Sequence, residues 1–216
     1  MSDHTVTVID YGMGNVGSIL NMLKKIGVTA ALSRGPGDVL AADRLILPGV
    51  GAFDNAMSKL RALGYVDALN RRVLEDGVPI LGVCLGMQLF GRASEEGREP
   101  GLGWLDATTV RFRFDAEPAA LKIPHMGWNY VRPTRPSALF PESAELRRFY
   151  FVHSFHLQCG DLADVLSVTR YGLEFVSAVC HENIVGTQYH PEKSHRFGLA
   201  FFRAFAAWCP GRSARG

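Results

Sequence analysis

The chain has 216 residues and 47% hydrophobic content, which predicts a single domain, residues 1–216, with a sizeable core. Its 23 Lys and Arg nearly balance its 21 Asp and Glu without any block of like charges, so we expect no nucleic-acid partner. The longest apolar stretch, 78–90, is shorter than the roughly 20 residues of a membrane-spanning helix. Because the N-terminus also lacks the pattern of a secretory signal, we expect a cytoplasmic protein that binds no membrane.

The four cysteines lie far apart and form no Cys-x-x-Cys pair: Cys84, Cys159, Cys180 and Cys209. This arrangement is typical of a reducing compartment rather than of a disulfide framework. His153 and His156 are spaced like metal ligands but lack a matched second pair. We therefore expect no metal site and no cofactor, and at least one cysteine is a candidate reactive thiol.

Strand-like and helix-like segments alternate through the first half, as they do in a doubly wound sheet. Residues 5–10 predict a buried strand, and residues 29–32 and 45–47 predict two more. Between them, Gly27 is a good C-terminal stop for a helix. That helix is expected because apolar residues recur at spacings of three and four, at Val16, Ile19, Leu20, Leu23 and Ile26.

A second amphipathic helix is expected at 66–73, closed by Gly77 and followed by an apolar strand, 78–83, that leads into Cys84. From Trp104 onward, short strands and turns predict antiparallel additions. Aromatic residues at about helical spacing predict a closing helix, at Phe197, Phe201, Phe205 and Trp208. Together these elements predict an α/β fold with a mixed, largely parallel central sheet flanked by helices.

The segment Gly82-Val83-Cys84-Leu85-Gly86 lies between the predicted strand and a helix. It is the thiol counterpart of the nucleophile elbow, a sharp turn that exposes one reactive side chain. Larger side chains in place of the two glycines would collide with neighbouring backbone, and a helix N-terminus favours a thiolate. A free cysteine is more often a buried small hydrophobe, and the other three keep that interpretation.

The segment 186–192 offers a base for this thiol at the end of another predicted strand. Because Pro191 favours extended geometry before it, His190 and Glu192 can face the same side. The carboxylate would then orient the imidazole and stabilise its charged form. Taken alone, the His-Pro-Glu tripeptide would more often be a surface turn, and its pairing with the elbow favours the catalytic interpretation.

A glycine-rich loop, 47–53, follows the strand at 45–47. Backbone N–H groups near Val50 and Gly51, with that of Leu85, could form an oxyanion hole for a tetrahedral intermediate. A phosphate-binding loop is the alternative, but the segment has neither G-x-G-x-x-G nor a following Gly-Lys-Ser/Thr.

Together these segments resemble the class I, triad-type glutamine amidotransferases, in which they occur in the same order. The likeness covers nearly the whole chain and implies a flavodoxin-like α/β fold. Within that class the chain resembles the glutaminase subunits of imidazole glycerol phosphate synthase, an enzyme of histidine biosynthesis. Five segments carry this resemblance: 10–15 (Asp-Tyr-Gly-Met-Gly-Asn), 48–53 (Pro-Gly-Val-Gly-Ala-Phe), 124–129 (Pro-His-Met-Gly-Trp-Asn), 150–154 (Tyr-Phe-Val-His-Ser) and 190–194 (His-Pro-Glu-Lys-Ser).

The resemblance implies that L-glutamine is hydrolysed and that the ammonia passes to a separate (β/α)₈-barrel cyclase subunit in a heterodimer. The implied glutamine-binding residues are Gly49, Gln88, Glu96, His153 and Ser154. The residues implied to face the cyclase are Asn15, Met126, Trp128 and Lys193. In an unfamiliar protein, a Trp or Met would more often be a core residue, and a Lys a solvated surface charge. The sequence departs from the usual pattern at Phe90, Phe155 and Tyr189, none of them in the triad.

Two other functions compete with this one. The amidotransferase component of anthranilate or aminodeoxychorismate synthase shares the triad, but those proteins usually carry histidine at the position of Met87, and segment 124–129 is not typical of them. The second alternative is a non-catalytic regulatory module of the same fold, which the intact triad disfavours. A cysteine peptidase is a weaker alternative still.

Overall fold

The computed structural model describes residues 5–114, 121–141 and 147–211. The strands are β1 (Val6–Val8), β2 (Ala30–Leu32), β3 (Arg44–Gly49), β4 (Ile80–Cys84), β5 (Ala93–Ser94), β6 (Ala107–Arg111), β7 (His125–Pro133), β8 (Arg147–His153), β9 (Phe155–Cys159), β10 (Val165–Tyr171), β11 (Leu173–His181) and β12 (Ile184–Thr187). The α-helices are α1 (Val16–Lys25), α2 (Pro36–Leu40), α3 (Phe53–Ala62), α4 (Tyr65–Asn70), α5 (Leu85–Gln88) and α6 (His195–Ala207). A π-helical turn, η1 (Arg71–Glu75), and two 3₁₀ turns, η2 (Leu162–Asp164) and η3 (Pro191–Lys193), complete the described elements.

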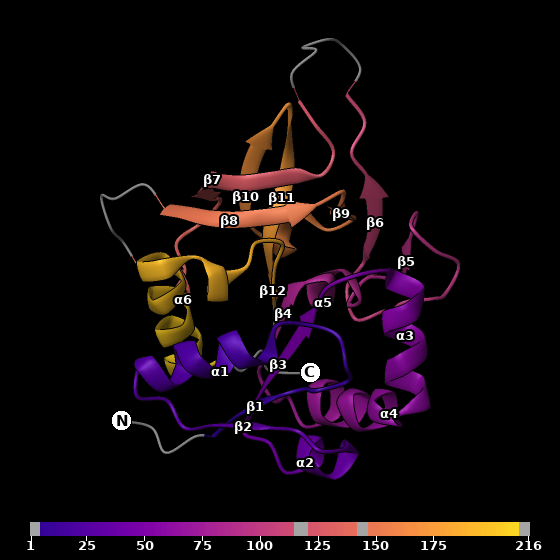
Figure 1. Cartoon of the computed structure of the whole chain (residues 1–216), viewed down its shortest axis with the longest axis vertical. Helices are drawn as coiled ribbons and strands as arrows, with labels where there is room; N and C mark the ends of the chain where they lie inside the picture. The colour runs from indigo at the N-terminus through magenta and orange to yellow at the C-terminus, as the bar shows by residue number, and fades with distance from the viewer. Residues whose placement is uncertain (1–4, 115–120, 142–146, 212–216) are drawn as a thin grey trace.

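The described strands form one mixed sheet with the order β2-β1-β3-β4-β12-β11-β10-β7-β8 (Figure 1). The five strands from β2 to β12 are parallel, and the rest of this path is antiparallel. Strands β5, β6 and β9 join it through the pairing of β9 with β11. The mixed α/β sheet is therefore confirmed, and its antiparallel part is extensive.

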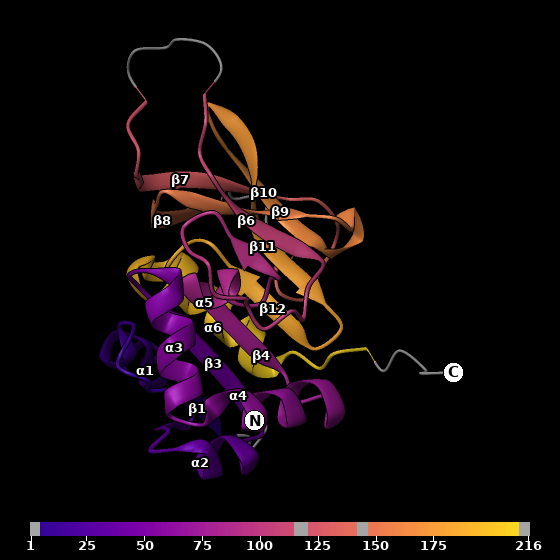
Figure 2. The ribbon, with the colours of Figure 1, turned by 90° about the vertical axis from the view of Figure 1, so that its right-hand side faces the viewer.

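Helices cover both faces of the parallel strands. Helices α1 and α6 lie together on one side, and α3 and α4 lie on the other (Figures 1 and 2). Side chains alternate between the two cores because successive residues of a strand point to opposite faces. In β4, Ile80 packs in the core with α3 and α4, whereas Leu81 and Val83 pack in the core with α1 and α6. This two-sided burial explains the continuous apolar sequence of the strand.

The predicted helices differ from the observed ones mainly at their ends. Helix α1 occupies most of the expected segment and is followed by Gly27 at a φ of +74°. The helix expected at 66–73 is divided into α4 and the π turn η1. Trp208 lies just beyond α6 rather than in its last turn. Within the described ranges, no helix is both long and apolar enough to cross a membrane.

Two glycines make the turn after β4 possible by allowing close backbone contacts. A Cβ on Gly86 would lie only 2.0 Å from the carbonyl oxygen of Leu47 in β3. A Cβ on Gly82 would lie 2.7 Å from the backbone nitrogen of Met87 and 2.6 Å from the ring of Phe90. The first of these contacts is with the backbone of a neighbouring strand, which cannot move without disturbing the sheet.

We predict that Gly86→Ala lowers the free energy of unfolding by about 1–3 kcal/mol or more, because the added methyl group collides with the Leu47 carbonyl. Chemical denaturation followed by circular dichroism measures this change. Gly17→Ala in α1 is the matched control, since nothing lies within 4 Å of its Cβ position. Alanine should stabilise α1 by up to about 1 kcal/mol. Equal stabilities for the two variants would contradict the assignment of the contact.

Candidate active site

Cys84 is the last residue of β4 and the residue that precedes α5. Its φ of 56° is unusual for a residue with a side chain, and such a backbone costs about 1–3 kcal/mol. The turn directs Cys84 into a cavity, yet only 7% of the residue is exposed. Helix α5 is a single turn of four residues. Because one helical turn contributes little stability of its own, the strained turn at Cys84 depends mainly on its packing against neighbouring strands.

His190 reaches the same cavity because β12 lies beside β4 in the parallel part of the sheet. Thr187, the last residue of β12, pairs with Val83, the residue before the cysteine. Two backbone contacts then fix the histidine: its N–H donates to the Tyr150 carbonyl at 2.9 Å, and its carbonyl accepts from the Ser194 hydroxyl at 2.6 Å. The imidazole is thus held at a defined place although it lies beyond the strand.

Glu192 lies behind the histidine, with Oε1 2.7 Å from His190 Nδ1. It occupies the 3₁₀ turn η3, not the extended segment on which the sequence argument relied. Because the carboxylate accepts from Nδ1–H, Nε2 is left on the side of Cys84. Burial lowers the pKa of His190, but a Cys84 thiolate and the Glu192 carboxylate outweigh this effect and raise it from 6.5 to about 10. The pair is arranged to keep the imidazole charged.

The cavity has a volume of about 320 Å³ and brings together residues from distant parts of the chain. Nine of its lining residues were named from the sequence: Val50, Gly51, Cys84, Leu85, Gln88, Glu96, His153, Ser154 and His190. Three others were not predicted as site residues: Pro124, Val152 and Phe155. Gly49 and Glu192 lie outside the lining, because Gly49 pairs with Cys84 within the sheet and Glu192 sits behind the imidazole.

The glycine-rich loop lies beside the nucleophile because Gly49 is in register with Cys84. Gly51 has a φ of +97°, a conformation that favours glycine. At the far end of the loop, Glu96 Oε2 accepts a hydrogen bond of 2.9 Å from the backbone N–H of Phe53, the first residue of α3. This contact connects the proposed oxyanion loop to a predicted glutamine-binding residue.

A relay of hydrogen bonds behind the cavity wall was not foreseen. The Phe155 carbonyl can only accept, so the 2.7 Å contact places the proton of His153 on Nδ1. His153 Nε2 must then accept from His125 Nδ1–H at 3.0 Å, and His125 Nε2 accepts from Asn129 at 3.2 Å. Burial lowers the pKa of His153 to about 3 and that of His125 to about 4, which keeps both rings neutral. The Asn129 amide also donates to the Arg170 carbonyl.

Sequence reasoning also missed Gln188 and Tyr11. Gln188 Nε2 lies 3.6 Å from the Cys84 sulfur, and its position two residues before His190 in a strand-end segment was the available signal. The Tyr11 hydroxyl donates to the Pro48 carbonyl at 2.8 Å and so supports the glycine-rich loop. Burial and the charge of a Cys84 thiolate raise the pKa of Tyr11, so it remains a donor. The only sequence signal for Tyr11 was its position in the segment 10–15, which carries part of the family resemblance.

The four residues implied to face a cyclase are all exposed. Met126 and Trp128, 62% and 39% exposed, lie on the outer face of β7, so neither is a core residue. Trp128 stacks on His195, and Lys193 lies above the ring of Tyr150. Tyr150 is opposite Trp128 in the β7–β8 pair, and Tyr130 adds a further exposed aromatic residue. Asn15 caps α1, its side chain accepting from the Ser18 N–H.

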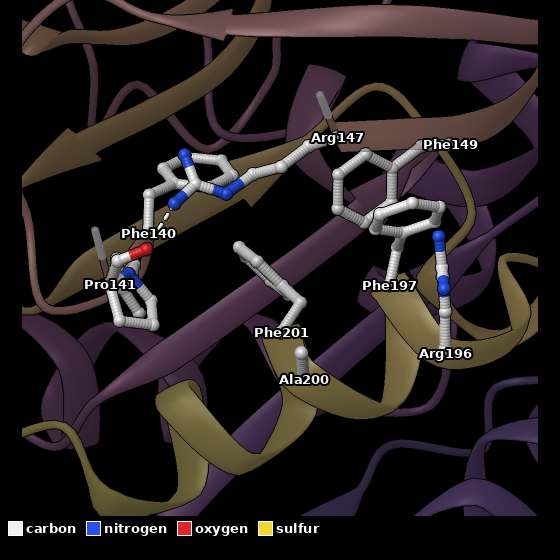
Figure 3. A pocket seen from close by; sticks show the side chains of 9 residues that line it. Phe140, Pro141, Arg147, Phe149, Arg196, Phe197, Ala200 and Phe201 are labelled. Carbon is white, nitrogen blue, oxygen red and sulfur yellow. Dashed lines mark hydrogen bonds between the residues drawn. The ribbon is translucent and has the colours of Figure 1, made fainter. Parts of the chain in front are cut away.

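A second cavity, of about 190 Å³, lies between α6 and the start of β8 (Figure 3). The described residues that line it are mostly aromatic or apolar: Leu139, Phe140, Pro141, Arg147, Phe149, Arg196, Phe197, Ala200 and Phe201. The Arg147 guanidinium donates to the Pro141 carbonyl and lies over the Phe140 ring (Figure 3). None of these described lining residues is a thiol or a carboxylate, so this cavity does not repeat the arrangement found at Cys84.

Comparison with known proteins agrees with this fold. The model of the family "glutamine amidotransferase class-I" matches residues 7–206, so the chain belongs to that family. Within it, the chain is 49% identical to imidazole glycerol phosphate synthase subunit HisH 2 of Methanococcus maripaludis, over 93% of this chain and 98% of that protein. The subunit HisH 2 of Pseudomonas aeruginosa gives the same identity and coverage. A crystal structure of a glutamine amidotransferase shares the fold, with a TM-score of 0.71 and 19% identity over 92% of this chain and 96% of that chain.

We predict that Glu192→Gln lowers the pKa of His190 below its value of about 10, because the neutral amide no longer stabilises the imidazolium. A titration by NMR with labelled histidine measures the shift. The proton on folded His190 stabilises the wild type fully below pH 6.5, and this stabilisation is lost as the pH rises through about 10. The difference in free energy of unfolding between the wild type and Glu192→Gln should therefore shrink from pH 7 to pH 10.

Glu174→Gln is the matched control, since Glu174 pairs with Arg132 at the surface and does not line the cavity. It should leave the titration of His190 unchanged. An unchanged pKa of His190 in Glu192→Gln would disprove the electrostatic role of the carboxylate.

Proposed function

We propose that this protein hydrolyses L-glutamine to glutamate and ammonia, with Cys84 as nucleophile, His190 as acid and base, and Glu192 as the group that orients His190. One observation carries the proposal: a cysteine at a strained elbow shares a cavity with a buried imidazole whose far nitrogen is held by a carboxylate at 2.7 Å. Sulfur, imidazole and carboxylate in this order form the arrangement of a thiol hydrolase.

The reaction follows from the charges of these groups. The Cys84 thiolate attacks the side-chain amide carbon of glutamine, and the electrons of the C=O bond move to oxygen. Backbone N–H groups of Val50, Gly51 and Leu85 stabilise that oxyanion. The His190 imidazolium gives its proton to the departing nitrogen, which leaves as ammonia, and a glutamyl thioester remains. Neutral His190 then takes a proton from water as the water oxygen attacks the thioester carbon. The C–S bond breaks, the Cys84 thiolate and the His190 imidazolium are restored, and glutamate leaves after its new carboxyl group loses its proton to solvent.

The remaining polar residues of the cavity suit the two ends of an amino acid. Glu96 is an acceptor for the α-ammonium group, while Gln88, His153 and Ser154 lie where they can hold glutamine. The α-carboxylate would meet backbone or hydroxyl donors of the segment that includes Ser154. Gly49 contributes by allowing close approach, since a Cβ there would lie 2.6 Å from the Gly86 nitrogen.

We further propose that the ammonia passes to a (β/α)₈-barrel cyclase subunit and is used in histidine biosynthesis. The relatives at 49% identity are named as subunits of imidazole glycerol phosphate synthase, which supports a partner. The exposed side chains of Met126, Trp128 and Tyr130 support a docking face on β7. The four free cysteines fit a reducing cytoplasm, and the single described sheet fits one domain over residues 1–216.

We predict that Cys84→Ala abolishes the release of glutamate from glutamine, because the described lining of the cavity contains no second thiol. Synthesis from added ammonium ions by the complex with the cyclase should persist, since that reaction bypasses the thiol. Glutamate release and ammonium-dependent synthesis are measured on the same preparation. Cys159→Ala, at a partly buried cysteine outside the cavity, is the control and should retain both activities. Glutamine hydrolysis by Cys84→Ala would end the proposal.

We predict that Trp128→Ala weakens binding to the cyclase at least tenfold, because exposed tryptophans in docking faces often dominate binding energy. Isothermal titration calorimetry of the purified subunits measures the dissociation constant. Leu162→Ala is the control, since Leu162 is 79% exposed in η2 and outside the β7 face. Equal affinities of the two variants would show that the cyclase does not dock on Trp128.

A further inference from the structure

We propose that Gln188 positions the nucleophile by donating a side-chain N–H hydrogen bond to the Cys84 sulfur. The inference rests on the proposed glutaminase function and adds a residue to its machinery. Gln188 Nε2 lies 3.6 Å from Sγ, within the range of a hydrogen bond to sulfur. Gln188 is fully buried in the described structure and is not one of the residues that line the glutamine cavity.

The direction of this amide follows from a backbone carbonyl. The carbonyl of Phe155 can only accept, so the Gln88 atom that lies 3.1 Å from it must be the nitrogen. The same nitrogen lies 3.0 Å from one amide atom of Gln188, which must therefore be the oxygen. The other amide atom of Gln188, the one that faces the sulfur, is then the nitrogen. Reversing either amide would place two donors or two acceptors against each other.

The Phe155 carbonyl is itself held in place. It accepts from His153 Nδ1–H at 2.7 Å, and the relay through His125 and Asn129 fixes that histidine in one tautomer. The backbone N–H of Gln188 donates to the Ser177 carbonyl at 2.9 Å, which anchors the other end of the residue. The amide that meets the sulfur is therefore fixed from both sides.

The two states of the thiol have different partners. A protonated Cys84 can donate to the Val152 carbonyl, 4.0 Å away, and a thiolate cannot. The thiolate can accept from Gln188, which can only donate from its nitrogen. Deprotonation thus exchanges a carbonyl contact for an amide contact, and the amide holds the charged sulfur in one orientation for attack. Because Gln188 touches the sulfur and not the cavity, this effect belongs to the chemical step rather than to glutamine binding.

The test compares Gln188→Met and Gln188→Glu in the complete complex with the cyclase. Methionine keeps the length of the side chain but removes the donor to the sulfur and the acceptor for Gln88, which keeps its hydrogen bond to the Phe155 carbonyl. Glutamate keeps the shape and the acceptor for Gln88 but places an oxygen beside the sulfur. We expect kcat for glutamine hydrolysis at pH 8 to fall on the order of tenfold in Gln188→Met, and further in Gln188→Glu because a carboxylate repels a thiolate. KM for glutamine should change by less than about threefold in both.

Three controls separate this role from folding and from the proposed function. Ammonium-dependent synthesis by both variants should equal that of the wild type, which shows that the subunit is folded and assembled. Gln158→Met, at an exposed position in β9, should retain full glutaminase activity. Glutaminase activity of the wild type, absent in Cys84→Ala, tests the function itself and does not depend on Gln188.

Three outcomes would overturn the role of Gln188 while leaving the glutaminase function intact. The first is an unchanged kcat in Gln188→Met. The second is a rise in KM without a loss of kcat, which would assign Gln188 to substrate binding. The third is a parallel loss of ammonium-dependent synthesis, which would assign Gln188 to the stability of the fold.

Discussion

The parallel pairing of β4 with β12 is the constraint on which the site depends. Cys84 and His190 are more than a hundred residues apart, and they meet because the carboxyl ends of two adjacent parallel strands lie at the same edge of the sheet. The register places Thr187 opposite Val83, and it thereby sets how many residues beyond each strand separate its end from the cavity. A shift of one residue would turn alternate side chains to the opposite face and separate the two groups.

Electrostatic balance at the site depends on burial as much as on proximity. His190 and Glu192 are almost fully buried, so their charges attract each other strongly and water does little to screen them. An isolated imidazolium in this position would lose its proton. The neighbouring carboxylate and the thiolate reverse that tendency, while His125 and His153, which face no carboxylate among the described residues, stay neutral. The same type of side chain therefore serves as a charged acid at one place and as a neutral structural donor at another.

Local patterns predicted much of the fold, because they depend on residues close in the chain. The spacing of Val16, Ile19 and Leu23 predicted α1, and the apolar run before Cys84 predicted β4. The family resemblance added most of the cavity lining. Neither the local spacing of residues nor the family resemblance predicted α3. Its contribution to the site is the backbone N–H of its first residue, Phe53, which donates to Glu96.

The contacts that escaped prediction are long-range and depend on side-chain direction. Gln88 and Gln188 are separated by 100 positions, and neither has a spacing that signals the other. The 3₁₀ turn at Glu192 was missed for a different reason: the constraint that proline places on the preceding residue says little about the residues after it.

Strand β7 divides its residues between two tasks. Met126, Trp128 and Tyr130 point outward, while His125 and Asn129 point inward and belong to the relay behind the cavity wall. Because neighbouring positions on one strand point to opposite faces, evolution can alter the outward residues, which we propose to form a docking face, without changing the inward ones. The proposed docking face and the hydrogen-bond relay are thereby free to diverge at different rates along nine consecutive residues.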